Sequence, residues 1–172
     1  MKRLPLVFLL LAFGPLAVAQ DTLSVGEVSV ARGAKATGII RIPDGVDKGL
    51  DIPVSVVHGK EPGKILALIA GTHGYEYTSI LALQRLLPQL DPQKMKGSVI
   101  LVHMANPETF FARRIYVSSD GKNLNRVYPG KKDGTISERI AEAITREVID
   151  QATNLIDMHS GDGNESLRPY SY

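Results

Sequence analysis

The sequence has 172 residues, of which 20 are Lys or Arg, 18 are Asp or Glu and none is Cys. Such an even balance gives no electrostatic footprint for nucleic acid or an anionic membrane, and the lack of thiols excludes disulfides and thiolate-bound zinc. Any metal must therefore sit on His and carboxylate ligands.

The first 19 residues are typical of a secretory signal peptide. Lys2 and Arg3 precede an apolar run, and Ala17-Val18-Ala19 is the small-x-small pattern that signal peptidase accepts. The run is short for a membrane span, which needs ~20 apolar residues, although an uncleaved anchor is the alternative. We expect an exported protein, periplasmic or secreted, without a stable membrane span.

Residues 20–58 predict a short β-rich segment. Apolar and polar residues alternate loosely between residues 23 and 30, and Pro43-Asp44-Gly45 indicates a turn. A β-branched run then covers residues 52–57 and ends at a polar turn, where we expect His58 to be exposed.

From residue 59 to residue 172 the pattern changes to alternating buried strands and amphipathic helices. The expected elements, in chain order, are a strand at 65–70, a helix at 76–87 with Ile80, Leu81 and Leu83 on its apolar side, a strand at 98–103, a polar loop at 117–135, a helix with a capping box between Thr135 and Glu138, and a buried strand at 155–158. This order predicts an α/β domain, with a mixed, largely parallel sheet and helices on both faces.

The first candidate site is Gly71-Thr72-His73-Gly74-Tyr75-Glu76, just past the carboxyl end of the strand at 65–70. Sites gather at such strand ends in open α/β sheets. His73 and Glu76 are three residues apart at a helix start, so both side chains can point the same way. Alone, the pair fits a helix cap and a surface charge equally well.

The second candidate is His159, which ends the strand at 155–158. With His73 and Glu76 it makes a His₂Glu set, typical of catalytic zinc because three protein ligands leave a fourth position for water. Zinc lowers the pKa of that water to ~7 and polarises a substrate carbonyl. His103 is instead expected in the core or at its rim.

The polar loop supplies candidate substrate contacts. Arg126 beside Asn125 can clamp a substrate carboxylate, and Arg114, upstream of them, can steady a developing oxyanion. The alternative is that both arginines form ordinary surface ion pairs, which contribute little.

Three motifs taken together resemble the succinylglutamate desuccinylase/aspartoacylase family of the zinc carboxypeptidase superfamily. They are residues 71–76, Asn-Leu-Asn-Arg-Val-Tyr-Pro-Gly at 123–130 and Asp-Met-His-Ser-Gly at 157–161, and the resemblance extends from about Gly26 to the end. It implies that His73, Glu76 and His159 bind zinc and that Asn125 and Arg126 hold a substrate carboxylate. It also implies that Arg114, or Arg113 in a shifted register, polarises the scissile carbonyl.

The reaction implied by this resemblance is hydrolysis of an amide in an N-acyl amino acid or peptide with a free carboxylate. One rival is a periplasmic carboxypeptidase that acts on cell-wall peptides with the same residues. Another is a non-catalytic module that binds a carboxylate ligand or zinc.

Two departures from the family pattern matter. Asn123 stands where the family commonly has Asp to orient a zinc-bound histidine, and an amide there gives weaker support. The family's general-base glutamate lies well downstream of the last zinc ligand, but this sequence stops 13 residues after His159, with only Asp162 and Glu165 as acids. We therefore expect an incomplete catalytic domain that binds zinc but hydrolyses poorly, with an exposed sheet edge that favours homo-oligomers.

Overall fold

The structure is a computed structural model and describes residues 21–117, 119–163 and 165–166. The predicted signal peptide, residues 1–19, lies outside these ranges. Across the described part of the chain, no helix combines the length and the apolar character needed to cross a bilayer.

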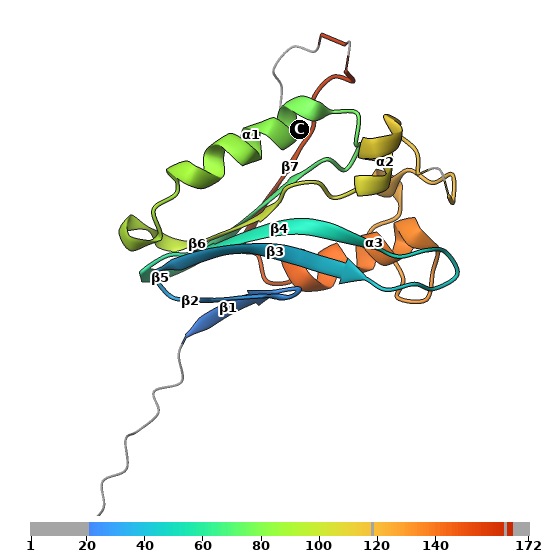
Figure 1. The fold of residues 1–172 in the computed structure, drawn as a ribbon. Coiled ribbons are helices and arrows are strands. Elements are labelled where there is room, and N and C mark those ends of the chain that lie inside the picture. Colours follow the sequence, from blue (N-terminus) through green and yellow to red (C-terminus); the bar gives the residue numbers. More distant parts are fainter. Residues whose placement is uncertain (1–20, 118, 164, 167–172) are drawn as a thin grey trace, which may run out of the picture.

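Five strands form one mixed sheet in the order β3-β4-β6-β5-β7 (Figure 1). Their bounds are Ala34–Ile42 for β3, Leu50–His58 for β4, Glu61–Ala70 for β5, Lys96–Val102 for β6 and Asn154–Met158 for β7. β4 pairs antiparallel with β3 and β6, whereas β5 pairs parallel with β6 and β7. The mixed sheet is therefore confirmed, and its parallel half carries the three strands at 61–70, 96–102 and 154–158.

A separate two-stranded sheet precedes it, made by β1 (Thr22–Val25) and β2 (Val28–Ala31). This hairpin confirms the predicted β-rich start. The main sheet contains strands from both sides of the expected boundary at residues 58 and 59. β4, which ends at His58, pairs with β6, which lies after that boundary in the sequence.

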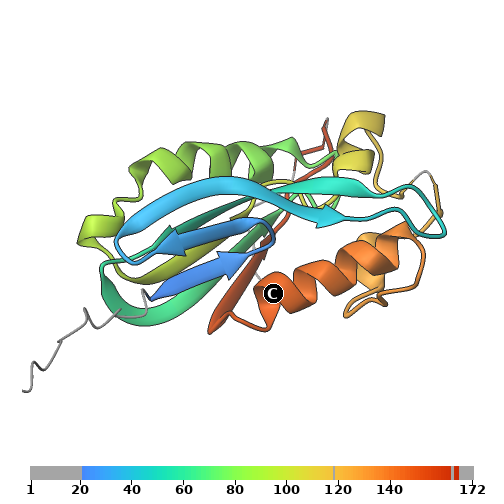
Figure 2. The same cartoon turned by 60° about the horizontal axis from the view of Figure 1, so that its bottom comes forward.

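The two longer helices cover opposite faces of the main sheet (Figures 1 and 2). α1 (Tyr77–Leu86) packs on one face and α3 (Ile136–Ile144) on the other, beside the β1–β2 hairpin. A short helix, α2 (Pro107–Ala112), follows β6. Single turns of 3₁₀ or π helix occur at Leu87–Gln89, Pro92–Lys94, Leu124–Arg126 and Thr145–Ile149.

Two apolar layers hold the helices to the sheet. Ile80 and Leu83 of α1 pack with Leu68 and its neighbours on one face. Ile136, Ile140 and Ile144 of α3 join the larger core on the other face. Burial of each such side chain stabilises the fold by about 1.5–3 kcal/mol, so helices on both faces follow from the apolar stripes, as predicted. The capping box is present too, because the Glu138 carboxylate accepts from the Thr135 backbone N–H at 3.0 Å.

Two local predictions are wrong, one about α1 and one about the start of β5. Leu81 is 50% exposed, because one residue advances a helix by about 100° and Ile80 already faces the sheet. β5 begins at Glu61 rather than at residue 65, since Glu61 pairs with Lys96 and an irregularity separates this pair from Ile65.

Two predictions of burial also fail. His58 is only 4% exposed, because β3 pairs alongside it and Arg32 reaches across to the Gly59 carbonyl. The third strand, β7, was expected to be buried, yet Leu155 is 44% and Ile156 50% exposed. Among the described residues β7 has only β5 as a neighbour, so it forms the predicted exposed sheet edge. Homo-oligomers through this edge stay a prediction.

Candidate metal centre

A tight turn after β5 brings His73 and Glu76 together. The turn starts at Gly71, whose φ of +69° suits glycine and whose added Cβ would lie 3.1 Å from the Met104 Cα. Glu76 occupies the N-cap position of α1, and its backbone N–H donates to the His73 carbonyl at 3.2 Å. As a result His73 Nδ1 lies 2.8 Å from Glu76 Oε1.

β7 delivers His159 to the same carboxylate. Because β7 runs parallel to β5, the two strands end at one edge of the sheet. His159 Nδ1 lies 2.8 Å from Glu76 Oε2, and the two imidazole centroids are 5.0 Å apart. One ligand atom from each of His73, Glu76 and His159 lies within 4.8 Å of the others. The structure therefore brings together the three predicted metal ligands.

The outer nitrogen of each imidazole also has a partner. His73 Nε2 lies 3.0 Å from Asn123 Oδ1, and His159 Nε2 lies 3.0 Å from Asp157 Oδ2. Amide and carboxylate oxygens only accept, so each Nε2 must donate. In a neutral imidazole this leaves Nδ1 with a free lone pair beside Glu76, which is the atom that a cation would bind.

Sequence reasoning missed Asp157 and Thr72. Asp157 accepts from the Thr72 hydroxyl at 3.1 Å through Oδ1 while its Oδ2 meets His159. This carboxylate thereby ties the loop after β5 to the end of β7. The spacing could have predicted the contact between Asp157 and His159. Residues two apart on a strand share a face, and Asp157 stands two residues before His159.

The charges of the three central groups depend on one another. Burial raises the pKa of Glu76, but hydrogen bonds from His159 and His73 outweigh it and hold that pKa at about 2. Hydrogen bonds to Asp157 and Glu76 raise the pKa of His159 to about 10. The hydrogen bond to Glu76 likewise raises the pKa of His73, against burial. Without a metal, the Glu76 carboxylate therefore favours the protonated form of both imidazoles.

Comparison with known proteins places this geometry in a family. The profile of the succinylglutamate desuccinylase/aspartoacylase catalytic domain matches residues 62–170. The chain belongs to this family. The match begins in β5 and includes all three residues of the His₂Glu cluster.

Similar proteins agree with that assignment. The chain is 36% identical over 138 residues to an N-alpha-acetyl-L-2,4-diaminobutyric acid deacetylase of Halomonas elongata, covering 78% of this chain and 40% of the relative. An aspartoacylase family protein from Mesorhizobium loti is 31% identical with a TM-score of 0.70. A product-bound ectoine utilization protein from Ruegeria pomeroyi is 28% identical with a TM-score of 0.71. Each of these two structures matches 83% of this chain and 44% of its own. The chain thus spans less than half the length of these relatives.

The cluster of this family member fits a zinc ion. Zinc takes His nitrogen and carboxylate oxygen at about 2.0–2.2 Å, and tetrahedral ligands at such lengths lie about 3.4 Å apart. The two Nδ1–Oε distances of 2.8 Å need only a small expansion to reach that spacing. Two imidazoles and one carboxylate also leave one position of a tetrahedral ion free.

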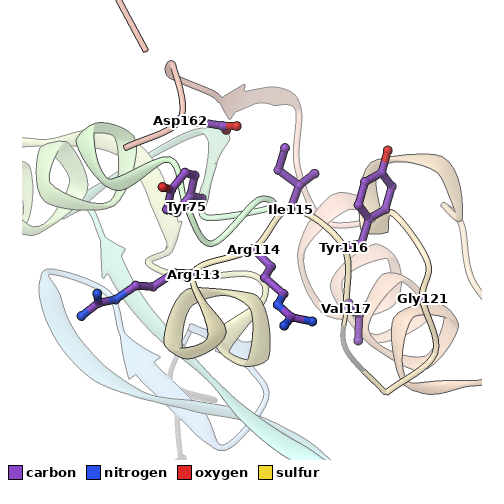
Figure 3. A pocket seen from close by; sticks show the side chains of 8 residues that line it. All are labelled: Tyr75, Arg113, Arg114, Ile115, Tyr116, Val117, Gly121 and Asp162. Atoms are coloured by element: carbon purple, nitrogen blue, oxygen red, sulfur yellow. The ribbon is translucent and has the colours of Figure 1, made fainter. Parts of the chain in front are cut away.

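Two of the predicted arginines line a cleft that also includes Tyr75, which stands between His73 and Glu76 in the sequence. Arg113 and Arg114 line a cavity of about 550 Å³ together with Tyr75 and Asp162 (Figure 3). Both guanidinium groups point away from Asp162 in the figure, in different directions, and both residues are exposed. A second cavity of about 590 Å³ shares Tyr75 and Arg113 and has an aromatic lining, namely Tyr77, Phe110 and Phe111. The catalytic role of Arg114 stays a prediction.

The predicted carboxylate clamp lies in the single 3₁₀ turn Leu124–Arg126. Asn125 is half-buried and Arg126 exposed, and the Arg126 side chain donates to the Asn125 carbonyl at 2.9 Å. Their neighbour Asn123 joins the loop to His73. The two residues therefore lie one turn away from the cluster, and their binding of a substrate stays a prediction.

The remaining histidines lie elsewhere. His103 is 8% exposed at the end of β6 and contacts the Ser55 hydroxyl at 2.7 Å, as expected for a core histidine. His58 is buried at the opposite end of the sheet, 3.9 Å from Asp21. Among the residues the structure describes, neither joins a cluster that could hold a metal.

Proposed function

We propose that this chain forms the zinc-binding part of a hydrolase that cleaves the amide bond of an N-acyl amino acid, with His73, Glu76 and His159 as the metal ligands. One observation carries the proposal: the Glu76 carboxylate lies between two Nδ1 atoms at 2.8 Å, while each outer Nε2 is held by an acceptor. Such outer partners fix the tautomer and orientation of metal-binding histidines. A zinc ion bound there supplies Lewis acidity to a water molecule and to the substrate carbonyl.

The arginines supply the contacts to the substrate in this proposal. Arg126 with Asn125 holds the free carboxylate, and Arg114, or Arg113, faces the polarised carbonyl. All three arginines are exposed, and among the described residues none of them forms an ion pair with an acid. Unpaired guanidinium groups favour a ligand that carries a carboxylate, and Arg113 and Arg114 also line a cleft that could receive it.

Hydrolysis needs a base near the water molecule at the metal site. We expect this chain to hydrolyse its substrate slowly, because its two candidate bases face each other instead. Asp162 and Glu165 bind each other through backbone and side-chain hydrogen bonds. In the described part of the chain neither forms a hydrogen bond with His73, Glu76 or His159. A base must lie within hydrogen-bond reach of the proton that it takes.

We also propose that the protein is exported. The basic start, apolar run and Ala17-Val18-Ala19 of residues 1–19 support this location. Fusion of residues 1–25 to a reporter enzyme that is active only outside the cytoplasm tests it. A reporter that stays inactive and unprocessed would contradict export.

Metal binding is the direct test of the proposed function. Purified protein, stripped with a chelator, is titrated with Zn²⁺ in competition with a fluorescent zinc indicator, alongside Glu76→Gln. We expect one zinc per wild-type chain and a strong loss in the variant, because the amide keeps the shape of the carboxylate but lacks its charge. Equal affinity of the two proteins would contradict the proposed ligand set.

Binding of small molecules then separates the proposed substrate class from its rivals. Calorimetry compares N-acetyl amino acids with cell-wall muropeptides, each with zinc-loaded and chelator-treated protein. Zinc-dependent binding of N-acyl amino acids supports the deacylase, and a preference for muropeptides supports the carboxypeptidase. Binding that survives chelation and is lost in Arg126→Ala supports a non-catalytic carboxylate-binding module.

A further inference from the structure

The start of α2 lies directly against the loop that carries His73 and Glu76. The segment after β6 bonds to the end of β5 and to the loop after it, with the Ala105 N–H donating to the Ala70 carbonyl at 2.8 Å and the Asn106 N–H to the Gly71 carbonyl at 3.0 Å. Gly74, between the two ligands, packs against the backbone of α2. A Cβ added to Gly74 would lie 1.9 Å from the Phe110 amide nitrogen, so only glycine lets α2 approach this far.

One buried hydroxyl joins the two segments. Thr109 is fully buried, and its Oγ1 accepts from the Gly74 backbone N–H at 3.0 Å. The same hydroxyl donates to the Asn106 carbonyl at 3.0 Å, so its proton is already committed and its lone pair faces Gly74. Gly74 follows His73 directly and precedes Glu76 by two residues, so this bond fixes the backbone between them.

Asn106 holds Thr109 in place. It is fully buried at the N-cap of α2, and its side-chain oxygen accepts from the Thr109 backbone N–H at 3.3 Å. The Thr109 carbonyl in turn accepts from the Arg114 N–H at 3.0 Å. Thr109 therefore contacts the ligand loop with its side chain and the arginine turn of the cleft with its backbone.

Loss of this hydroxyl has a specific consequence for the ligands. The Gly74 N–H is buried and, among the described residues, Thr109 is its hydrogen-bond partner. A buried N–H without a partner is costly, so the loop would shift to reach another acceptor or water. Such a shift changes the separation of His73 Nδ1 and Glu76 Oε1, now 2.8 Å.

We propose that Thr109 is a positioning residue for the zinc ligands, acting through the Gly74 backbone and supported by Asn106. This inference rests on the proposed zinc site. It assigns to α2 a task separate from substrate binding, which is to set the distance between the first two ligands before the metal arrives.

The test measures zinc affinity and ligand geometry in variants of Thr109. Thr109→Val and Thr109→Ala lack the hydroxyl with and without filling its space, whereas Thr109→Ser keeps it. Thr153→Val is a matched control, since the Thr153 hydroxyl also accepts a backbone N–H, from Ile65 at 3.2 Å, but in the middle of β5 and away from the ligand loop. Zinc affinity is measured by indicator competition, geometry by the visible absorption of bound Co²⁺, and stability by urea denaturation of the metal-free proteins.

We expect Thr109→Val and Thr109→Ala to weaken zinc binding by about 10-fold, at the lower end of the effects seen for outer partners of a metal site, and to alter the Co²⁺ spectrum. Thr109→Ser and Thr153→Val should match the wild type in both. Wild-type affinity and spectrum in both hydroxyl-free variants, or an equal loss in Thr153→Val, would overturn the positioning role. A wild-type protein that binds no zinc would instead overturn the proposed function itself.

Discussion

The four histidines of this chain form two contrasting pairs. At the carboxyl edge of β5 and β7, both ring nitrogens of His73 and His159 face an oxygen acceptor. His58 and His103 are more deeply buried, yet three of their four ring nitrogens have no hydrogen-bond partner within the described residues. Burial alone therefore does not distinguish a ligand from a core histidine. The distinguishing feature is a shared carboxylate on the inner nitrogens and a separate acceptor on each outer one.

The same contrast appears in the direction of the pKa shifts. Hydrogen bonds to Asp157 and Glu76 raise the pKa of His159 to about 10, and the bond to Glu76 raises that of His73. Burial lowers the pKa of His58 and of His103. At His58 the charge of Arg32 lowers the pKa further, and Asp21, 3.9 Å away, raises it too little to compensate. Nearby acids thus favour the charged form of His73 and His159, whereas burial disfavours it at His58 and His103.

The largest predicted effect breaks the comparison directly. His159→Ala removes one of three zinc ligands, so we expect zinc affinity to fall by more than the ~10–100-fold typical of an outer partner. His103→Ala should leave zinc affinity unchanged, because that ring lies outside the cluster. Indicator competition on both variants checks this, with circular dichroism to verify folding. Similar zinc affinities in the two variants would mean that the cluster is not the metal site.

The outer acceptors give the next largest effect. Asp157→Ala leaves the His159 Nε2 and the Thr72 hydroxyl without their acceptor, and we expect zinc binding to weaken by about 10–100-fold. Asn123→Asp should act in the opposite direction, since a carboxylate raises the basicity of His73 more than an amide does. Isothermal titration with Zn²⁺ measures both. If Asn123→Asp binds zinc more weakly than the wild type, Asn123 does not support a ligand in this way.

The pKa shifts predict opposite pH dependence of stability for the two pairs of histidines in metal-free protein. A histidine whose pKa is raised by folding stabilises the fold. This stabilisation is fully present below pH 6.5 and is lost as pH rises towards 10, the folded pKa of His159. A lowered pKa, as in His103, gives a contribution present above pH 6.5 and lost as pH falls. Each titrating proton changes stability by at most about 1.4 kcal/mol per pH unit.

Urea denaturation with chelator present, from pH 5 to pH 10, tests these two opposite pH dependences of the free energy of unfolding. His159→Gln should flatten the decline on the alkaline side, and His103→Gln should flatten the decline on the acid side. The difference between each variant and the wild type isolates the one titration. Curves that stay parallel to the wild type at all pH values would refute the assignment.

Sequence patterns predicted the parts of this site that are local. His73 and Glu76 are three residues apart after an apolar strand, and His159 ends another, so a shared sheet edge sufficed to bring them together. The helices at 77–86 and 136–144 followed from their apolar stripes and from a capping pair. The helix signals extend over a few residues, whereas the meeting of His159 with Glu76 also required β7 to pair beside β5.

The failures depend on tertiary neighbours instead. The turn after His58 reads as exposed, and only the pairing of β3 beside β4 buries that ring. β7 has the apolar composition of an inner strand, but its position at the sheet edge is set by the whole topology. α2 escaped prediction because it has only six residues, although Asn106-Pro107 is a typical helix start.

The smallest predicted effect concerns Asp120, whose hydrogen bonds fix the loop that carries Asn123. Asp120 accepts from the Ser137 N–H and hydroxyl at 2.9 Å each and from the Lys122 N–H at 3.0 Å, so it ties the loop to the first turn of α3. Asp120→Ala should lower stability by about 1–2 kcal/mol, as loss of a helix cap does. Because Asn123 stands three residues further on, zinc affinity should fall as well, but by less than in Asp157→Ala. Denaturation and zinc titration of the same preparations separate the two effects: lost stability with unchanged zinc binding would show that η3, at Leu124–Arg126, keeps Asn123 in place without Asp120.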